Sequence, residues 1–422
     1  MVLAKNPTQT PNMITLRAYK TELRPNNVQR NLLHQHAGCA RFAYNWGLTQ
    51  KITQYEKTRK SPSAMELHKQ LNRLKSTSFP WMYQVSKCAP QEALRDLDKA
   101  FKNFFRRLKT GEKPGFPRYK SRKRGIGSFR LTGTIRVHHD RIQLPRLGII
   151  RLKERGYLPT GGGWLRMLSA TVSEKAGRWF VSVQVEERIT IPQNKGPRAG
   201  VDWGLETLLT VSDGVEFPNP RALSRYDRKL RRAQRSLSRK RRGSRNRAKT
   251  RHRLRRIHAR ITNIRKDTLH KASSWLARTK SATIIEDLHV KGLLKNKQLA
   301  RVIADAGFGE LWRQLTYKSR WYGSRLHFAP RFYPSSKRCS RCGHIKEEMP
   351  LSVRVFRCER CGLVLGRDLN AALNLLWLLV AASWAETLNA WLRREVATPQ
   401  GVVPVHDAGT KHQPCPLGDK IG

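Results

Sequence analysis

The chain has 422 residues, with 84 Lys and Arg against 30 Asp and Glu, and a formal net charge of +54. Its length and 39 % apolar content suffice for a sizeable core, which excludes a disordered tail protein. So large a charge repels itself unless a polyanion neutralises it, so a nucleic acid is the expected partner. A membrane is not expected, because the longest apolar stretch, 373–385, falls short of the about 20 residues that a spanning helix needs.

The N-terminal half predicts two kinds of structure. Residues 14–23 alternate apolar and polar side chains as a strand does, and the sequence RPNN ends the run. From 28 to about 107, apolar side chains recur at helical spacing. After a basic loop at 109–125, short β-like runs recur to about 191 at hairpin spacing. They predict a small barrel that the N-terminal strand completes.

Residues 191–200 have the composition of a linker into a second unit. A strand ending at Asp202, a turn at Gly204, a second strand and a hairpin turn at Asp213-Gly214 are expected there. The block 221–270 holds 21 Lys or Arg against two acids, and its apolar positions fit two helices joined at RRGSRN. A buried strand ending at Glu286, a helix around 308–315 and a strand-like run, SRLHFAP, follow.

Seven cysteines and the two ends of the chain bear on the compartment. The odd count and two close pairs favour metal binding in a reducing cytoplasm over a disulfide framework. The N-terminal stretch has no apolar segment of signal-peptide length, so export is not expected. The C-terminal stretch is rich in Pro and Gly, and we predict a disordered tail over 391–422.

Four of the cysteines have the spacing C-x2-C-x15-C-x2-C: Cys339, Cys342, Cys358 and Cys361. Two-residue gaps let both thiolates of a pair face one tetrahedral Zn²⁺, and a glycine directly after each pair allows a tight turn. With no fifth ligand nearby, we predict one closed structural zinc site, and the basic side chains around it suggest phosphate contact. Cys39 and Cys88 are expected to be core residues, and Cys415 has no assigned role.

Three carboxylates occupy positions suited to a metal site. Asp202 and Glu286 end apolar strands, and Asp368 opens a helix. Such acids suit Mg²⁺, and two ions about 4 Å apart activate water and stabilise the leaving oxygen of a phosphodiester. Taken singly, each acid also fits a turn, an ion pair or a helix cap. Asp287 is a rival ligand, but successive strand residues point to opposite faces, so only one of the pair serves.

The ordered motifs GVDWGLETLLTVSDG, IIEDL, the paired cysteines and RDLNAALNLL resemble the split RuvC nuclease core and zinc knuckle of the TnpB family. These are RNA-guided DNA endonucleases encoded by insertion-sequence transposons. The resemblance covers about 14–388 and includes AFKNFFRRLKTGEKPGFPRYKS and YPSSKRCSRCG. It implies an RNase H-like core in which Asp202, Glu286 and Asp368 hold Mg²⁺, expected as two ions. Members commonly read Asp-Arg-Asp where this chain has Gly366-Arg367-Asp368, with the acid next to the helix kept.

The resemblance also implies an α+β multidomain organisation. The β-barrel wedge would comprise 1–26 and 119–192, the helical recognition lobe 27–118, the split RuvC-like α/β nuclease core 193–335 and 366–390, and the zinc knuckle 336–365. The implied partners are a guide RNA from the transposon end and double-stranded target DNA, with a short adjacent motif read on that DNA. No phosphate-binding loop of the P-loop type occurs, so no nucleotide cofactor is expected.

Several alternatives remain open. The chain may be read instead as a nuclease-silent RNA-guided repressor, a compact type V CRISPR effector, or a transposase that acts directly on transposon ends. Tyr44 and Trp46 fit either base stacking or a helix core. Arg367 is expected to meet phosphate, and Ser335, Ser336 and Lys337 are candidates for DNA contact near the cut.

Overall fold

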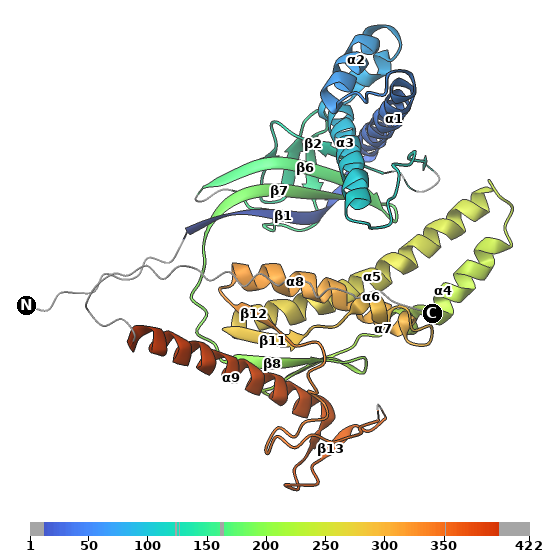
Figure 1. Ribbon diagram of the computed structural model, residues 1–422. Helices are drawn as coiled ribbons and strands as arrows, with labels where there is room; N and C mark the ends of the chain where they lie inside the picture. Colours follow the sequence, from blue (N-terminus) through green and yellow to red (C-terminus); the bar gives the residue numbers. More distant parts are fainter. Residues whose placement is uncertain (1–11, 123–124, 126, 161–163, 351, 396–422) are drawn as a thin grey trace, which may run out of the picture.

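The computed structural model describes residues 12–122, 125, 127–160, 164–350 and 352–395 (Figure 1). Cys415 and most of the predicted tail, 396–422, lie outside these residues. The first part of that predicted tail, 391–395, continues the last helix, so the boundary expected at 390 falls inside a helix. None of the helices in the described part of the chain has both the length and the apolar character needed to cross a bilayer.

The predicted helical segment forms a bundle of α1 (Asn27–Thr58), α2 (Ala64–Thr77) and α3 (Cys88–Lys109), with a 3-10 turn, η1 (Pro80–Gln84), before α3. Asn26 and Ser63 begin the first two helices with capping boxes, in which the cap side chain and the third helical residue bond each other's backbone N–H. Leu33, Leu48 and Leu94 are fully buried between these helices. Tyr44 is buried and Trp46 packs against the same core, which favours the core interpretation of both.

A seven-stranded antiparallel sheet lies against the bundle in the order β2-β6-β7-β1-β5-β4-β3 (Figure 1). Its strands are β1 (Asn12–Arg24), β2 (Ser128–Leu131), β3 (Arg136–Val137), β4 (Arg141–Leu144), β5 (Gly148–Leu152), β6 (Leu165–Lys175) and β7 (Arg178–Thr190). The N-terminal strand pairs with β7 along its length and with β5 at its end, as expected. No ladder joins β2 to β3 among the described strands, so the backbone pairing found there leaves the sheet open.

The second unit is built on a five-stranded sheet in the order β10-β9-β8-β11-β12. Its strands are β8 (Arg198–Trp203), β9 (Thr207–Val211), β10 (Glu216–Pro218), β11 (Ala282–Glu286) and β12 (Arg325–Ala329). The first three form an antiparallel meander, whereas β11 runs parallel to both β8 and β12. The expected hairpin at Gly214 and the strands ending near Asp202 and at Glu286 are therefore present.

Helices cover both faces of this five-stranded sheet. On one face lie α5 (Arg245–Thr279), α7 (Ala300–Ala306) and α8 (Phe308–Trp321), which pack on Ala199, Val201 and Ile285. On the other lies α9 (Arg367–Glu395), whose Leu375 packs on Ile284. The basic block forms α4 (Ala222–Ser238) and α5, a hairpin projecting from the body, and α6 (Val290–Leu293) follows β11 (Figure 1).

Gly200 sets how closely α9 approaches the sheet. A Cβ atom built there would lie 2.0 Å from the carbonyl oxygen of Ala372 and 2.4 Å from the backbone nitrogen of Leu376. These are backbone atoms of α9, which cannot swing aside as a side chain does. Only glycine lets the helix lie this close to β8.

Gly200→Ala is therefore expected to lower the stability of the full-length protein by about 1–3 kcal/mol, the usual cost of overpacking. A decrease in Tm and in the denaturant midpoint would measure it. Gly309→Ala in α8 is the matched control, because no heavy atom lies within 4 Å of a Cβ there. That variant should be neutral or slightly stabilising, since alanine favours a helix over glycine. Equal Tm values for the two variants would contradict the proposed close contact.

Candidate metal and nucleic-acid site

Asp202 and Glu286 lie side by side because of the strand register. Val201 of β8 pairs with Ile285 of the parallel β11, so the next residue of each strand, Asp202 and Glu286, follows at the same level. Neighbouring strands are about 4.8 Å apart, and side chains alternate between faces. Gly200 and Ile284 face α9, so Asp202 and Glu286 point to that side.

Asp368 reaches the same place from the first turn of α9. Gly204, just after β8, lies so near that a Cβ added to it would be 3.9 Å from Asp368 Oδ2. The three predicted carboxylates are therefore neighbours, contributed by two adjacent strands and the helix that crosses them. The carboxylate oxygens of the three acids are not as close together as the sulfur atoms of the four cysteines. Among the described residues, the cysteines are the one group of potential metal ligands whose donor atoms all lie within 4.8 Å of each other.

The electrostatics of the three acids differ from those of ordinary surface acids. Burial raises the pKa of Asp202 well above its usual value, and the neighbouring charges of Glu286 and Asp368 raise it further, against an opposing effect of Arg367. Burial also raises the pKa of Glu286, although a hydrogen bond from Ser335 opposes the shift. Removing these carboxylates from water and crowding them together is unfavourable unless a cation neutralises them.

Asp287, the rival ligand, has another partner. Arg331 Nη2 donates to its Oδ2 over 2.7 Å. By contrast, no Lys, Arg or His within the described residues forms an ion pair with Asp202, Glu286 or Asp368, although the chain has a large excess of cations. The alternation argument expects one of Glu286 and Asp287 to face the cluster, and the pairing of Asp287 with Arg331 leaves Glu286 as the candidate.

Residues 336–365, here called the tetracysteine insertion, lie between β12 and α9. They contain β13 (Val355–Arg357) and most of β14 (Val364–Gly366), whose last residue lies just after the insertion. The Sγ atoms of Cys339 and Cys361 are 3.6 Å apart, as are those of Cys342 and Cys358. Tetrahedral Zn²⁺ with bonds of about 2.3 Å needs sulfur atoms about 3.8 Å apart, so the cluster fits zinc. Cys39 and Cys88, which lie outside it, are buried as expected.

The two cysteine pairs have the same turn geometry. Gly343 and Gly362 adopt positive φ angles of 75° and 71°, and each donates its N–H to the first cysteine of its pair over 3.0 Å. Burial disfavours the Cys358 thiolate, but hydrogen bonds from the backbone N–H groups of Cys361 and Arg360 and from the thiols of Cys339 and Cys342 outweigh burial and lower the pKa of this thiol to about 6. The same contacts between thiols raise the pKa of Cys361, so one proton is shared out unequally within the cluster.

Two asparagines, which the sequence analysis did not single out, tie the tetracysteine insertion to α9. Asn370 Nδ2 donates to the carbonyl of Arg338 over 2.7 Å, and Asn374 Nδ2 donates to the carbonyls of Ser335 (2.8 Å) and Arg338 (2.6 Å). Both asparagine side chains are buried. Two asparagines four residues apart in an apolar helix were the available signal, because buried amides require hydrogen-bond partners.

Ser335 connects the segment held by these two asparagines to the carboxylates. Its hydroxyl donates to Glu286 Oε1 over 2.7 Å, and its side chain is buried. Lys337 donates instead to the carbonyl of Glu347, and Arg367 Nη1 donates to that of Pro350 over 2.7 Å. Lys337 therefore bonds within the tetracysteine insertion, whereas Ser335 bonds a carboxylate of the cluster. Among the histidines, His289 is exposed, and His327 and His344 are half-buried.

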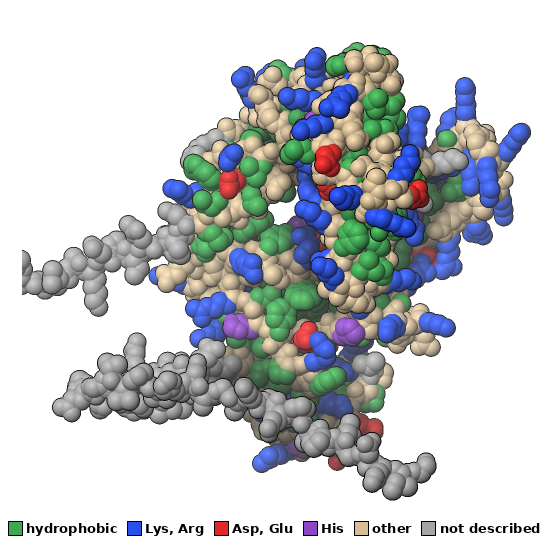
Figure 2. Space-filling view, turned by 45° about the horizontal axis from the view of Figure 1, so that its top comes forward, with side chains coloured by type: hydrophobic (Ala, Val, Ile, Leu, Met, Phe, Trp, Pro, Cys, Tyr) green, Lys and Arg blue, Asp and Glu red, His purple; other side chains and the backbone are tan. Residues whose placement is uncertain are grey.

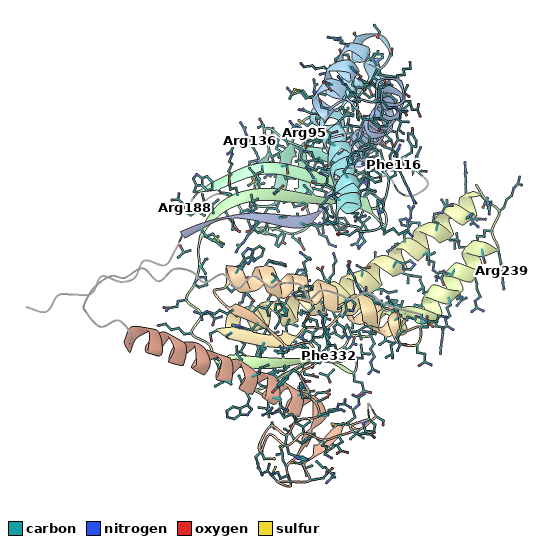
Figure 3. The ribbon with its side chains drawn as sticks, viewed as in Figure 1. Arg95, Phe116, Arg136, Arg188, Arg239 and Phe332 are labelled. Atoms are coloured by element: carbon teal, nitrogen blue, oxygen red, sulfur yellow. The ribbon has the colours of Figure 1, made fainter. Side chains whose placement is uncertain are left out.

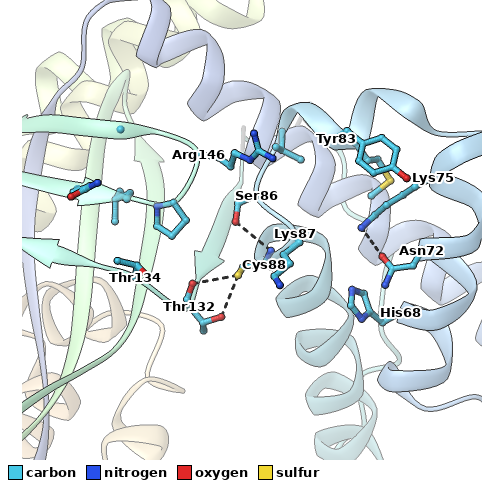
Figure 4. A pocket seen from close by; sticks show the side chains of 17 residues that line it. His68, Asn72, Lys75, Tyr83, Ser86, Lys87, Cys88, Thr132, Thr134 and Arg146 are labelled. Atoms are coloured by element: carbon cyan, nitrogen blue, oxygen red, sulfur yellow. Dashed lines mark hydrogen bonds between the residues drawn. The ribbon is translucent and has the colours of Figure 1, made fainter.

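Basic side chains dominate the surface. Figure 2 shows Lys and Arg over the visible face, prominently on the projecting α4–α5 hairpin. A cavity of about 880 Å³ opens between the helical bundle and the seven-stranded sheet, away from the carboxylates, with Lys75, Lys87 and Arg146 in its lining (Figure 4). These surfaces suit a polyanion.

Three protein-family profiles match the chain. The profile described as "Probable transposase" matches 170–297, "Cas12f1-like, TNB domain" matches 308–375, and "Helix-turn-helix domain" matches 13–60, where this chain holds β1 and α1.

Full-length relatives are also found. A protein of Streptomyces pristinaespiralis named "Putative RNA-guided DNA endonuclease" is 38 % identical over 376 residues, covering 87 % of this chain and 90 % of the relative. Escherichia coli K12 has a relative, "Putative RNA-guided DNA endonuclease InsQ", that is 33 % identical and covers 86 % of this chain and 92 % of its own. Among solved structures, one titled "Cryo-EM structure of the Cas12f1-sgRNA-target DNA complex" aligns with a TM-score of 0.49 and 15 % identity over 83 % of each chain.

Replacing a cluster cysteine should remove the metal. We expect the purified protein to contain one zinc per chain and Cys358→Ser to lose it, because three thiolates leave the tetrahedral site open. Elemental analysis by mass spectrometry measures the zinc content. Cys88→Ser is the matched control: its thiol lies outside the cluster and donates to the carbonyl of Thr132, as a hydroxyl can. Zinc retained at full stoichiometry in Cys358→Ser would contradict the assignment.

Proposed function

Since this chain belongs to the TnpB family of transposon-encoded RNA-guided DNA endonucleases, we propose that it binds a guide RNA from the transposon end and cleaves double-stranded DNA that matches the guide. Cleavage is metal-dependent phosphodiester hydrolysis next to a short motif that the protein reads on the DNA. The match to the relatives spans most of both chains, so the proposal concerns the whole protein.

The observation that carries the nuclease assignment is the half-buried cluster of Asp202, Glu286 and Asp368, which forms no ion pair with any residue that the structure describes, in a strongly basic protein. The order of the five-stranded sheet, a three-stranded meander followed by two parallel strands, supports an RNase H-like, RuvC-type core. In this proposal the three acids hold Mg²⁺, which suits carboxylate oxygens. The metal supplies an activated water and stabilises the leaving oxygen.

The chain's own residues shape that site. Ser335 orients Glu286 through the 2.7 Å hydrogen bond, and the tie between α9 and the tetracysteine insertion holds Asp368 in the first turn of its helix. Gly366, where family members commonly carry a further acid, has open space around a built Cβ. A larger side chain would fit there, so the missing acid is a difference in composition and not in backbone shape.

In this proposal the helical bundle, the seven-stranded sheet and the α4–α5 hairpin bind the nucleic acids. We assign 27–118 to sensing the guide–target duplex, and 1–26 with 119–192, the wedge built on the open seven-stranded sheet, to gripping the guide RNA. The cationic cavity between these units favours a role in reading the adjacent DNA motif. The α4–α5 hairpin supplies a dense row of arginines that suits the backbone of a heteroduplex.

Substitution of any one of the three carboxylates tests the nuclease assignment. In the ribonucleoprotein that carries its copurified RNA, Asp202→Ala, Glu286→Ala or Asp368→Ala should reduce plasmid cleavage in Mg²⁺ by at least about a hundredfold, because metal ligands are lost. Guide and target binding should stay largely unchanged in gel-shift measurements.

Asp267→Ala is the control for that experiment, because this exposed acid pairs only with Lys271 on α5. It should cut at the wild-type rate. Full activity in any of the three carboxylate variants would overturn the assignment. Binding without cutting by the wild-type complex would identify an RNA-guided repressor instead.

The raised pKa values of Asp202 and Glu286 predict how magnesium stabilises the protein at different pH values. A carboxyl with a raised folded pKa contributes stability below its unfolded pKa, and that contribution is lost as the pH rises through the folded pKa. Mg²⁺ binds the ionised form, so the increase in Tm that Mg²⁺ produces should grow between about pH 5 and about pH 8. A hundredfold excess over Kd corresponds to about 2.7 kcal/mol.

The matched comparison for magnesium is Asp202→Asn, which keeps the shape of the side chain and removes its charge. Subtracting its melting curves from those of the wild type removes the contribution of other titrating groups. The Mg²⁺-dependent shift should be small in this variant at every pH. A wild-type shift that is independent of pH would rule out these carboxylates as the binding groups.

A further inference from the structure

Phe332 lies in the loop between β12 and the tetracysteine insertion (Figure 3). We propose that it is a stacking platform for an unpaired base of the DNA strand that enters the carboxylate site. This inference rests on the proposed nuclease function and adds the form of its substrate, a single strand with at least one base free of its neighbours.

The exposure of Phe332 is the first observation. Its side chain is 92 % exposed, the highest fraction among the large hydrophobic side chains that the structure describes, ahead of Met65 at 71 %. Burying a phenylalanine side chain typically stabilises a folded protein by about 1.5–3 kcal/mol, and the exposed ring of Phe332 makes no such contribution. No ring contact in the described part of the chain involves it.

The second observation is that the loop is held on both sides of Phe332. The preceding residue, Arg331, bonds Asp287 over 2.7 Å. The following residue, Tyr333, packs against the core beneath α9, and its hydroxyl donates to the carbonyl of Asn374 over 3.2 Å. Its backbone N–H also donates to Pro330 over 3.0 Å. The backbone therefore presents the Phe332 ring to solvent in a fixed place.

That place is beside Glu286. Ala329, the last residue of β12, pairs in register with Glu286, so the loop leaves the sheet next to this carboxylate. Ser335 returns to it with the 2.7 Å hydrogen bond. Phe332 is three residues from each of these contacts along the chain, and we therefore infer that a strand held at the carboxylates reaches the ring.

The chemistry of the surroundings favours a nucleic-acid strand as the occupant. An exposed ring stacks on any base, whereas a base inside a duplex has both faces covered, so the base must be unpaired or at an end. The neighbouring tetracysteine insertion presents Arg341 and Arg360, both exposed, which suit phosphates. A fixed aromatic ring with cations nearby is the usual arrangement for binding single strands.

Fluorescence of a base analogue tests this contact without cleavage. The probe is a short single-stranded DNA containing 2-aminopurine, added to the ribonucleoprotein in Ca²⁺ in place of Mg²⁺. Stacking on Phe332 should quench the probe. Phe332→Ala should lose the quenching and weaken apparent affinity about tenfold, and Phe332→Trp should keep both. In Mg²⁺, Phe332→Ala should raise KM for DNA by a similar factor, with kcat at saturation changed less.

Trp377→Ala is the matched control, because this aromatic residue of α9 is also exposed, at 61 %. It should leave quenching and KM unchanged. Wild-type quenching and KM in Phe332→Ala would overturn the inference, as would a change of oligomeric state in that variant, which would assign the ring to a second copy of the chain. If the wild type fails to cut DNA but quenches the probe through Phe332, the proposed function fails and the stacking site stands.

Discussion

The close approach of α9 to β8 at Gly200 is the constraint on which the carboxylate cluster depends. Asp202 and Glu286 are brought together by strand register alone. The third acid, Asp368, comes from a helix that follows the tetracysteine insertion, and only the depth at which this helix packs brings it to the others. A helix held farther from the sheet by a single methyl group would carry its carboxylate away from the two strand ends.

The tetracysteine insertion is part of the same construction. The chain leaves the sheet after β12, folds around the cysteines and returns as α9. The side-chain amides of Asn370 and Asn374, on the returning helix, donate to carbonyl groups of the outgoing segment. Because Ser335 in that segment also bonds Glu286, the order of the cysteine cluster and the position of a carboxylate are physically connected. A structural metal held by the four cysteines would therefore stabilise more than its own small unit.

Sequence patterns predicted the elements well but not their contacts. Acids at strand ends, the two-residue cysteine gaps and the helical spacing of 308–315 are local signals, and each corresponds to an observed element or cluster. The partners of Asn374 and the exposure of Phe332 depend on segments far apart in the chain, which periodicity does not encode. The helical structure of 391–395 was missed because Pro and Gly further on suggested an earlier tail.

A comparison with other acids of this basic chain also supports the proposed metal site at Asp202, Glu286 and Asp368. Two acids of the scaffold have basic partners: Asp305 pairs with Arg265 between α7 and α5, and Glu187 pairs with Arg17 between β7 and β1. These pairs stabilise the scaffold because each charge has a partner. Asp202, with its pKa raised by burial and by two like charges, has none in the described residues. Three acids kept together and unpaired amid an excess of arginine are unfavourable in the free protein, and a bound divalent cation removes that cost.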